Sequence, residues 1–214
     1  MVTGRDVLLF IPNLIGYARI VFGIASAYYM PNDYVKASFC YATTFVLDEF
    51  DGRAARAFNQ ESKFGAILDL TTDRITSVMM QMMLCVFYPD YVFLFQMSMV
   101  IDIGAHWIFM HASTTSGLGH KAMAKETNPI LRLYYTSESF LTTLCLGNEF
   151  FYSMLYLLHF IEGPVVFGMN ILRMFLYLSF PIMATKTAIS VMHLVEAVNR
   201  LCSIDAADRN KSKS

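Results

Sequence analysis

Apolar residues fill six stretches of the chain, and short clusters of polar residues, proline or glycine separate the members of successive pairs. An apolar stretch of about 20 residues is long enough for a helix to cross a hydrocarbon core of about 30 Å. The pattern therefore predicts an all-α fold, a polytopic membrane protein with six transmembrane helices. The six windows are residues 13–30, 34–58, 65–88, 91–111, 140–160 and 169–199.

Three clusters of helix-breaking residues lie between the members of these pairs. Proline cannot continue a helix and glycine tolerates a chain reversal, so the clusters predict three helical hairpins. The breaks are Pro31-Asn32-Asp33, Pro89-Asp90 and Glu162-Gly163-Pro164. We expect residues 1–214 to form one membrane-embedded catalytic domain, with a flexible cytoplasmic tail from about residue 200 that is frayed after Asp205.

The composition supports a membrane protein and excludes a nucleic-acid partner. Hydrophobic residues make up 56% of the chain and charged residues only 15%, where a soluble domain carries about 25% charged residues. The formal net charge is −1. A protein that binds nucleic acid needs an excess of basic residues to neutralise phosphates, and this chain has none.

The basic residues are distributed unevenly between the two sides that alternating windows would define. One side would hold both termini, the turn between the second and third windows, and the loop between the fourth and fifth. That side carries Arg5, Arg53, Arg56, Lys63, Lys121, Lys125, Arg132, Arg200, Arg209, Lys211 and Lys213, and the other carries Lys36 and Arg173. Because positive residues concentrate on the cytoplasmic side, we expect both termini to be cytoplasmic.

Four carboxylates interrupt the second and third windows. Asp48 and Asp51 are three positions apart, and Asp69 and Asp73 are four apart, so each pair occupies one helical face. If the two helices form a hairpin across residues 53–64, the four side chains converge. Like charges this close repel one another unless cations neutralise them, and hard oxygen ligands select Mg²⁺ or Mn²⁺. The pattern predicts a two-metal site.

Three further residues around these carboxylates suit a phosphate-containing substrate. Gly52 and Gly65 lack side-chain bulk, so a ligand or a neighbouring backbone can approach closely. Arg56 supplies a planar, permanently charged fork that matches phosphate. At the cytoplasmic end of a membrane bundle, this combination favours an enzyme that acts on a lipid phosphate.

Other polar residues inside the windows have simpler interpretations. Arg19 and Lys186 are expected to snorkel or to form pairs inside the bundle. Asp102 and His106 are four positions apart, and we interpret them as packed polar residues rather than catalytic ones. We assign no role to His193 or to the remaining histidines.

The acidic stretch resembles the motif of the CDP-alcohol phosphatidyltransferase family. Asp48-x-x-Asp51-Gly52-x-x-Ala55-Arg56, followed by eight residues and Gly65-x-x-x-Asp69-x-x-x-Asp73, agrees with that motif at every fixed position. Further segments resemble the eukaryotic, inositol-using branch of the family, so the resemblance covers nearly the whole chain. They are PNLIGYARIVF, DEFDGRAARAFNQ, NPILRLYYTS, LCLGNEFFY and DAADR.

This resemblance implies a fold, an activity and a set of roles. The fold would be the six-helix CDP-alcohol phosphotransferase fold, a homodimer in the endoplasmic reticulum membrane. The activity would transfer the phosphatidyl group of CDP-diacylglycerol to myo-inositol, giving phosphatidylinositol and CMP. Asp48, Asp51, Asp69 and Asp73 would bind Mg²⁺ or Mn²⁺, with Asp73 also the general base. Gly52, Arg56 and Ser62 would contact the CDP-diacylglycerol head group.

Two alternatives remain open from the residues alone. The motif concerns the CDP half of the substrate, so glycerol phosphate, serine or choline could replace inositol as the acceptor. Five polar residues on the predicted cytoplasmic side are candidates for the border of the acceptor pocket. They are Lys121, Lys125, Asn128, Arg132 and Tyr135. In a different class, a cation transporter would also place carboxylates within its helices.

Overall fold

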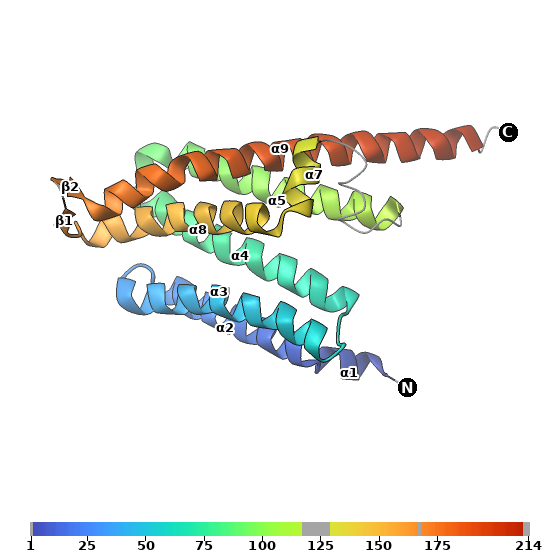
Figure 1. Ribbon diagram of the computed structural model, residues 1–214, viewed down its shortest axis with the longest axis horizontal. Coiled ribbons are helices and arrows are strands. Elements are labelled where there is room, and N and C mark those ends of the chain that lie inside the picture. The colour runs from blue at the N-terminus through green and yellow to red at the C-terminus, as the bar shows by residue number, and fades with distance from the viewer. Residues whose placement is uncertain (1, 117–128, 167, 212–214) are drawn as a thin grey trace. The chain divides into compact units, whose positions relative to one another are not determined.

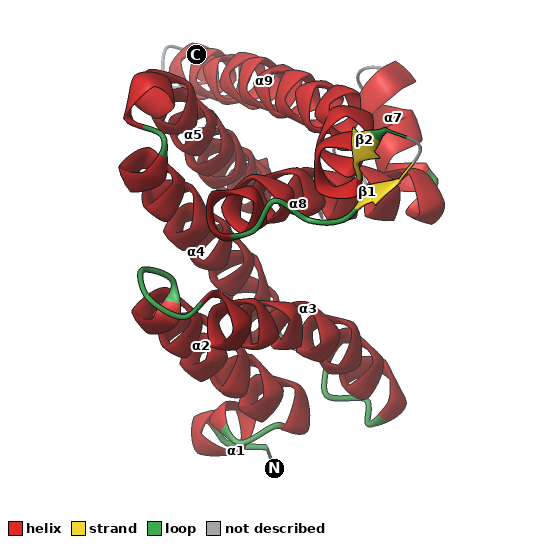
Figure 2. Ribbon diagram, turned by 90° about the vertical axis from the view of Figure 1, so that its left-hand side faces the viewer, coloured by secondary structure: helices red, strands yellow, loops and turns green. Residues whose placement is uncertain are grey.

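The computed structural model describes residues 2–116, 129–166 and 168–211 (Figure 1). The chain divides into two compact units, Met1–Pro89 and Asp90–Ser214. We describe each unit by itself. Both are built almost entirely of helices, in agreement with the predicted all-α class, and Figure 2 distinguishes these helices from the single short strand pair.

The first unit consists of four helices, of which α2 is the central one. They are α1 (Gly4–Leu8), α2 (Ile11–Tyr29), α3 (Tyr34–Ala57) and α4 (Lys63–Phe87). α2 packs along α3 and also against α4. α3 and α4 do not pack extensively against each other, so the expected hairpin is held together through α2.

Polar side chains set the helix boundaries of this unit. The carboxylate of Asp33 accepts a hydrogen bond from the backbone N–H of Lys36 at 3.1 Å and caps α3. The hydroxyl of Ser62 accepts one from the N–H of Gly65 at 2.9 Å and caps α4. Contacts with the Lys36 side chain and backbone lower the pKa of Asp33. The predicted breaks at residues 31–33 and 89–90 are confirmed.

Small residues allow α2 to lie close to its neighbours. A Cβ atom added at Gly16 would be 2.8 Å from the Leu68 side chain of α4, closer than packed carbon atoms can approach. On the α3 side, the buried hydroxyl of Ser26 donates to the carbonyl oxygen of Ala37 at 2.9 Å. Close backbone approach and interhelical hydrogen bonds are the usual means of packing helices within a membrane.

The second unit contains four helices and one short hairpin among its described residues. They are α5 (Val92–Ser116), α7 (Pro129–Thr136), α8 (Glu138–Phe160), β1 (Val165–Val166), β2 (Met169–Asn170) and α9 (Ile171–Lys211). A short 3-10 helix, η1 (Pro89–Tyr91), precedes α5. α9 packs against both α5 and α8, and the antiparallel strands β1 and β2 connect α8 to α9.

A buried ion pair joins two helices of the second unit. The ammonium group of Lys186 on α9 contacts the carboxylate of Asp102 on α5, and each residue is only 6% exposed. The ring nitrogen Nδ1 of His106 lies 3.5 Å from the same carboxylate and 2.7 Å from the carbonyl oxygen of Asp102. Lys186 therefore pairs inside the bundle, as its position in an apolar window predicted.

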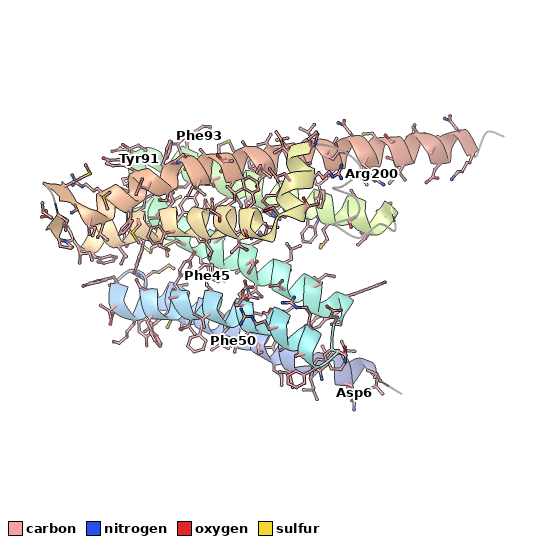
Figure 3. The ribbon with its side chains drawn as sticks, viewed as in Figure 1. Asp6, Phe45, Phe50, Tyr91, Phe93 and Arg200 are labelled. Atoms are coloured by element: carbon pink, nitrogen blue, oxygen red, sulfur yellow. The ribbon has the colours of Figure 1, made fainter. Side chains whose placement is uncertain are left out.

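Each predicted window coincides with a long helix. The bounds of the last helix differ most from those of its window. Two helical stretches, Pro89–Thr115 and Ile171–Lys211, are long and apolar enough to cross a membrane by length and composition. Large side chains such as Tyr91 and Phe93 are more than half exposed at the start of α5 (Figure 3). Six membrane crossings remain a prediction.

The last helix differs from the prediction at both ends. It begins at Ile171 because β2 ends at Asn170, whereas the window began at residue 169. It continues through Lys211, beyond the window and into the segment expected to be frayed. Alanine and long charged residues favour helix here, and Lys211 lies 3.6 Å from Asp208, one turn earlier.

Candidate active site

The four aspartates of the motif lie on two helices of the first unit. Asp48 and Asp51 are on α3, and Asp69 and Asp73 are on α4. The predicted convergence is confirmed, because carboxylate oxygens of Asp48, Asp51 and Asp69 lie within 4.8 Å of one another. The roles of these residues in binding and catalysis remain predictions.

A single arginine from α2 contacts all four carboxylates. Nη1 of Arg19 lies 2.6 Å from Asp51 and 2.7 Å from Asp69, and Nη2 lies 2.6 Å from Asp48 and also contacts Asp73. The Arg19 side chain is only 3% exposed. Each terminal nitrogen of the planar guanidinium thus bridges two carboxylates, one from α3 and one from α4.

The carboxylates are compatible with a divalent metal site. Mg²⁺ binds oxygen at about 2.0–2.1 Å, so two oxygens on one ion lie at most about 4.2 Å apart. The separations of up to 4.8 Å among Asp48, Asp51 and Asp69 exceed that limit by a fraction of an ångström. A small side-chain adjustment would therefore bring these oxygens onto a common ion, and carboxylate oxygens suit Mg²⁺ and Mn²⁺.

A cavity of about 360 Å³ adjoins the carboxylates within the first unit. Its wall includes Asp51 and Asp69 on the acidic side and Arg56 and Ser62 on the side of the turn between α3 and α4. Small residues, among them Gly52 and Gly65, and apolar residues complete the lining. The cavity therefore combines one strong cationic group with acidic oxygens in a confined volume.

Gly52 lies close to the guanidinium of the motif's arginine. A Cβ atom added at Gly52 would lie 3.6 Å from Nη1 and 3.9 Å from Nη2 of Arg56. The guanidinium of Arg56, one helical turn further along α3, therefore lies over the backbone of Gly52. Both residues line the cavity, so a planar guanidinium, a group that suits phosphate, lies at the cavity wall.

Gly65 on α4 lies close to Asn13 near the start of α2. A Cβ atom added there would lie 2.9 Å from Oδ1 of Asn13 and 3.1 Å from the hydroxyl oxygen of Ser62. Asn13 is 1% exposed. Its Nδ2 donates to the carbonyl oxygen of Val7 at 2.5 Å, and Oδ1 is a buried acceptor with no hydrogen-bond partner. Asn13 also lines the cavity.

The turn between α3 and α4 ends α3 with a defined local structure, and one side chain ties it to α2. Asn59 has a φ angle of 52°, the left-handed conformation typical of the residue that ends a helix. The N–H of Gln60 donates to the carbonyl oxygen of Ala55 at 2.9 Å, as in a Schellman motif. The side-chain oxygen of Gln60 accepts from the N–H of Ile11 at 2.8 Å.

Sequence reasoning missed the two α2 residues at the centre of the site. Arg19 was expected only to snorkel or pair, and Asn13 received no role. Their spacing contains a signal, because Asn13, Gly16 and Arg19 are three positions apart and share one helical face. The sequence alone does not show that α2 packs against both α3 and α4, and this packing is what brings that face to the carboxylates.

The structure describes only two of the five candidate residues for the acceptor pocket. Lys121, Lys125 and Asn128 lie outside the described residues. Arg132 and Tyr135 are on α7, and Arg132 is exposed. The residues that would bind an acceptor alcohol therefore remain predictions.

Comparison with known proteins identifies the family. Residues 9–198 match the CDP-alcohol phosphatidyltransferase family. The chain belongs to that family, and the aspartates, glycines and arginine of the motif are the residues around the cavity and the Arg19 cluster. No solved structure matches the chain significantly.

Several similar relatives have the same name, CDP-diacylglycerol--inositol 3-phosphatidyltransferase. The relative from Homo sapiens is 48% identical over 98% of this chain and 99% of its own length. The relative from Drosophila melanogaster is 43% identical over 97% of this chain and 92% of its own. The relative from Saccharomyces cerevisiae is 36% identical over 98% and 94%.

Proposed function

We propose that this protein transfers the phosphatidyl group of CDP-diacylglycerol to myo-inositol, producing phosphatidylinositol and CMP. The main support is that residues of the family motif line one cavity and form the acidic cluster beside it. The names of relatives that match this chain over nearly its whole length support the same substrate pair. Such a protein is a transferase of phospholipid biosynthesis.

Asp48, Asp51, Asp69 and Asp73 are the residues proposed to hold two Mg²⁺ or Mn²⁺ ions. When bound, these ions would polarise the diphosphate and stabilise the negative charge that develops on the departing CMP. Asp51 and Asp69 belong to the acidic cluster and also line the cavity. They therefore connect the proposed metal site to the space proposed for the diphosphate.

Gly52, Arg56 and Ser62 are the residues proposed to bind the head group. Arg56 would pair with a phosphate of the diphosphate, and the open backbone at Gly52 leaves room for that approach. Ser62 caps α4, and the N-terminus of this 25-residue helix borders the same cavity. Helix N-termini favour anions, which adds to the attraction for a diphosphate.

Asp73 is the proposed general base. Its carboxylate would accept the proton of an inositol hydroxyl as the hydroxyl oxygen attacks the phosphorus that bears diacylglycerol. A new P–O bond to inositol forms while the bond from that phosphorus to the CMP oxygen breaks, and CMP leaves with the bonding electrons. Asp73 suits this task because it lies outside the close group of oxygens that Asp48, Asp51 and Asp69 form.

The decisive experiment supplies the purified protein with CDP-diacylglycerol, Mn²⁺ or Mg²⁺, and a panel of acceptor alcohols. The panel contains inositol, glycerol phosphate, serine and choline, and CMP release is measured for each. The proposal expects inositol to be the best acceptor. If another alcohol is best, the assignment to inositol falls while the CDP-alcohol chemistry stands. If none releases CMP and ion flux is found instead, a transporter replaces the enzyme.

We further propose an endoplasmic reticulum location with six membrane crossings. The active site and both termini would face the cytoplasm, where the chain concentrates its basic residues. We also expect a homodimer, on the basis of the family to which the chain belongs.

A further inference from the structure

The contacts of Arg19 raise a question that the proposed function does not answer. The arginine uses both terminal nitrogens to contact Asp48, Asp51, Asp69 and Asp73. These are also the four residues proposed as metal ligands. One guanidinium and two divalent cations would therefore draw on the same small set of carboxylate oxygens.

The charges in this cluster indicate that Arg19 and divalent cations compete to neutralise the carboxylates. Four carboxylates carry four negative charges when ionised, and Arg19 supplies one positive charge. Two divalent ions would supply four, enough to neutralise the carboxylates without the arginine. A buried guanidinium kept among them would then repel the ions at short range, where the interior screens charge poorly.

The geometry of the arginine is consistent with a contact that is exchanged rather than permanent. Each terminal nitrogen of Arg19 contacts two carboxylates, but its buried Nε atom has no hydrogen-bond partner. A permanently structural buried arginine normally satisfies that donor as well. The cavity begins beside this contact, because Asp51 and Asp69, which share Nη1, also line it. A flexible side chain thus has an adjoining space that would receive anionic phosphates.

We propose that Arg19 is the exchangeable counter-ion of the carboxylate cluster. Its guanidinium holds the four carboxylates together, and it must release at least some of them when metal ions bind. Arg19 is therefore a positioning residue that sets the affinity of the site for metal. The inference rests on the proposed function, because it requires that these carboxylates bind a divalent metal.

Substitution of Arg19 distinguishes this role from a purely structural one, because the two roles predict opposite changes in Mn²⁺ affinity. Arg19→Gln removes the competing charge, so it should bind Mn²⁺ at least about tenfold more tightly than the wild-type protein. It should also melt at a lower temperature in a chelator, since the carboxylates then repel one another, and saturating Mn²⁺ should close that gap. A purely structural arginine predicts weaker Mn²⁺ binding and a stability gap that Mn²⁺ does not close.

The experiment measures Mn²⁺ binding to the full-length protein in detergent without nucleotide, by electron paramagnetic resonance of the free ion. Thermal unfolding is followed in parallel with chelator and with Mn²⁺. Arg53→Gln is the matched control, because Arg53 pairs with Glu49 on the exposed surface of α3 and the substitution removes the same charge outside the site. Its Mn²⁺ affinity should match that of the wild-type protein.

Arg19→Lys provides a second variant. A lysine keeps the charge but loses the two-pronged contact, so its Mn²⁺ affinity should lie between those of the wild-type protein and Arg19→Gln. Unchanged or weaker Mn²⁺ binding by Arg19→Gln overturns the proposal, and so does failure of this variant to fold in saturating Mn²⁺. If the wild-type protein binds no Mn²⁺, the proposed metal site itself is wrong and the inference falls with it.

Discussion

Asp51 and Asp73 contact the same arginine but have different surroundings. Asp51 lines the cavity and belongs to the close group formed with Asp48 and Asp69. Asp73 lies outside that group, with its second oxygen 3.7 Å from Arg74. At the scale of single residues, the four motif carboxylates are therefore not equivalent.

This difference predicts a division of labour. Asp73→Asn should lower turnover by at least about a hundredfold, because an amide keeps the shape but cannot accept a proton. It should leave much of the CDP-diacylglycerol binding. Asp51→Asn should weaken both Mn²⁺ and CDP-diacylglycerol binding, since it removes a proposed ligand of the metal that would hold the diphosphate. Turnover and binding are measured separately for each variant, and an equal loss of binding in both would contradict the assignment.

Gly65 carries a prediction about close packing in the site. Gly65→Ala places a methyl group 2.9 Å from Asn13 and 3.1 Å from Ser62, two short side chains with little freedom to move. Overpacking of this kind costs roughly 1–3 kcal/mol of stability. The added methyl group would also displace Asn13 and Ser62, which line the cavity, so KM for CDP-diacylglycerol should rise. The helix itself should tolerate alanine well.

Gly104→Ala is the matched control, because nothing lies within 4 Å of the atom that it adds in the middle of α5. Steady-state kinetics of both variants check the prediction. A Gly65→Ala protein with wild-type KM would show that the substrate does not use the space between Asn13 and Ser62.

The carboxylates, glycines and Arg56 could be predicted from sequence because the motif places them at fixed spacing on two helices. Arg19 and Asn13 could not, because their roles depend on tertiary packing. A buried arginine is ambiguous in sequence, since it becomes a site residue only when carboxylates from two other helices lie against it. Asn13 likewise gains its meaning from Gly65, far along the chain, where no side chain separates them.

The turn between α3 and α4 determines how the two acidic helices enter the site. Asn59 ends α3 in the left-handed conformation, Ser62 starts α4, and Gln60 between them holds the first residue of α2. At the scale of elements, one short turn therefore fixes the positions of three helix ends around the cavity.

Asn59 is the residue at which this turn can be tested. Asn59→Val should destabilise the protein by about 1–2 kcal/mol, because a β-branched residue clashes in the left-handed conformation. It should also weaken CDP-diacylglycerol binding through the displaced turn. Asn59→Gly should change stability little, since glycine adopts the same conformation freely. Chemical unfolding in detergent checks both, and equal effects of valine and glycine would show that the φ angle is not what matters.

The long elements were predictable because hydropathy and helix breakers act locally. Each apolar window became a helix, and the proline clusters at residues 31 and 89 ended helices as expected. The strand pair β1 and β2 was not predicted, since two-residue strands are too short to show an alternating pattern. The end of α9 was also missed, because hydropathy reports burial and the helical propensity of a polar tail is a separate property.

For the whole chain, every fixed position of the motif belongs to the first unit, Met1–Pro89. The second unit has its own buried charge pair, Asp102 and Lys186, outside the motif. The residues that we propose to bind the CDP half of the substrate therefore all lie in the first unit. The expectation of one catalytic domain and the identity of the acceptor both depend on what the second unit contributes.

The distribution of basic residues predicts the orientation of the chain in the membrane. In sealed microsomes, an impermeant protease should remove the segment after Arg200, because positive residues and both termini are expected in the cytoplasm. Arg200 is marked on α9 in Figure 3. Immunoblotting with a C-terminal tag detects the cleavage, and a lumenal marker protein that resists digestion is the control. A protected tail would reverse the predicted orientation.

The number of displacements at phosphorus follows from the groups that surround the cavity. A two-step route would need a nucleophile on the enzyme, activated by a neighbouring base. The described lining contains neither cysteine nor histidine. Its hydroxyl group belongs to Ser62, which caps α4 and has the carboxamide oxygen of Asn13 as its neighbour across Gly65 rather than a general base. Of the three lining carboxylates, Asp51 and Asp69 are assigned to metal binding, and Glu61 has no assigned role.

We therefore expect one direct attack by the acceptor hydroxyl within a ternary complex. A CDP-diacylglycerol analogue with a chiral thiophosphate at the transferred phosphorus should give product of inverted configuration, because a single in-line displacement inverts the centre. Initial rates measured against both substrates should show sequential kinetics. Ser62→Ala should retain turnover and lose mainly the cap of α4, worth about 1 kcal/mol of stability. Net retention at phosphorus, or a phosphatidyl-enzyme trapped when the acceptor is withheld, would establish a nucleophile and a second displacement.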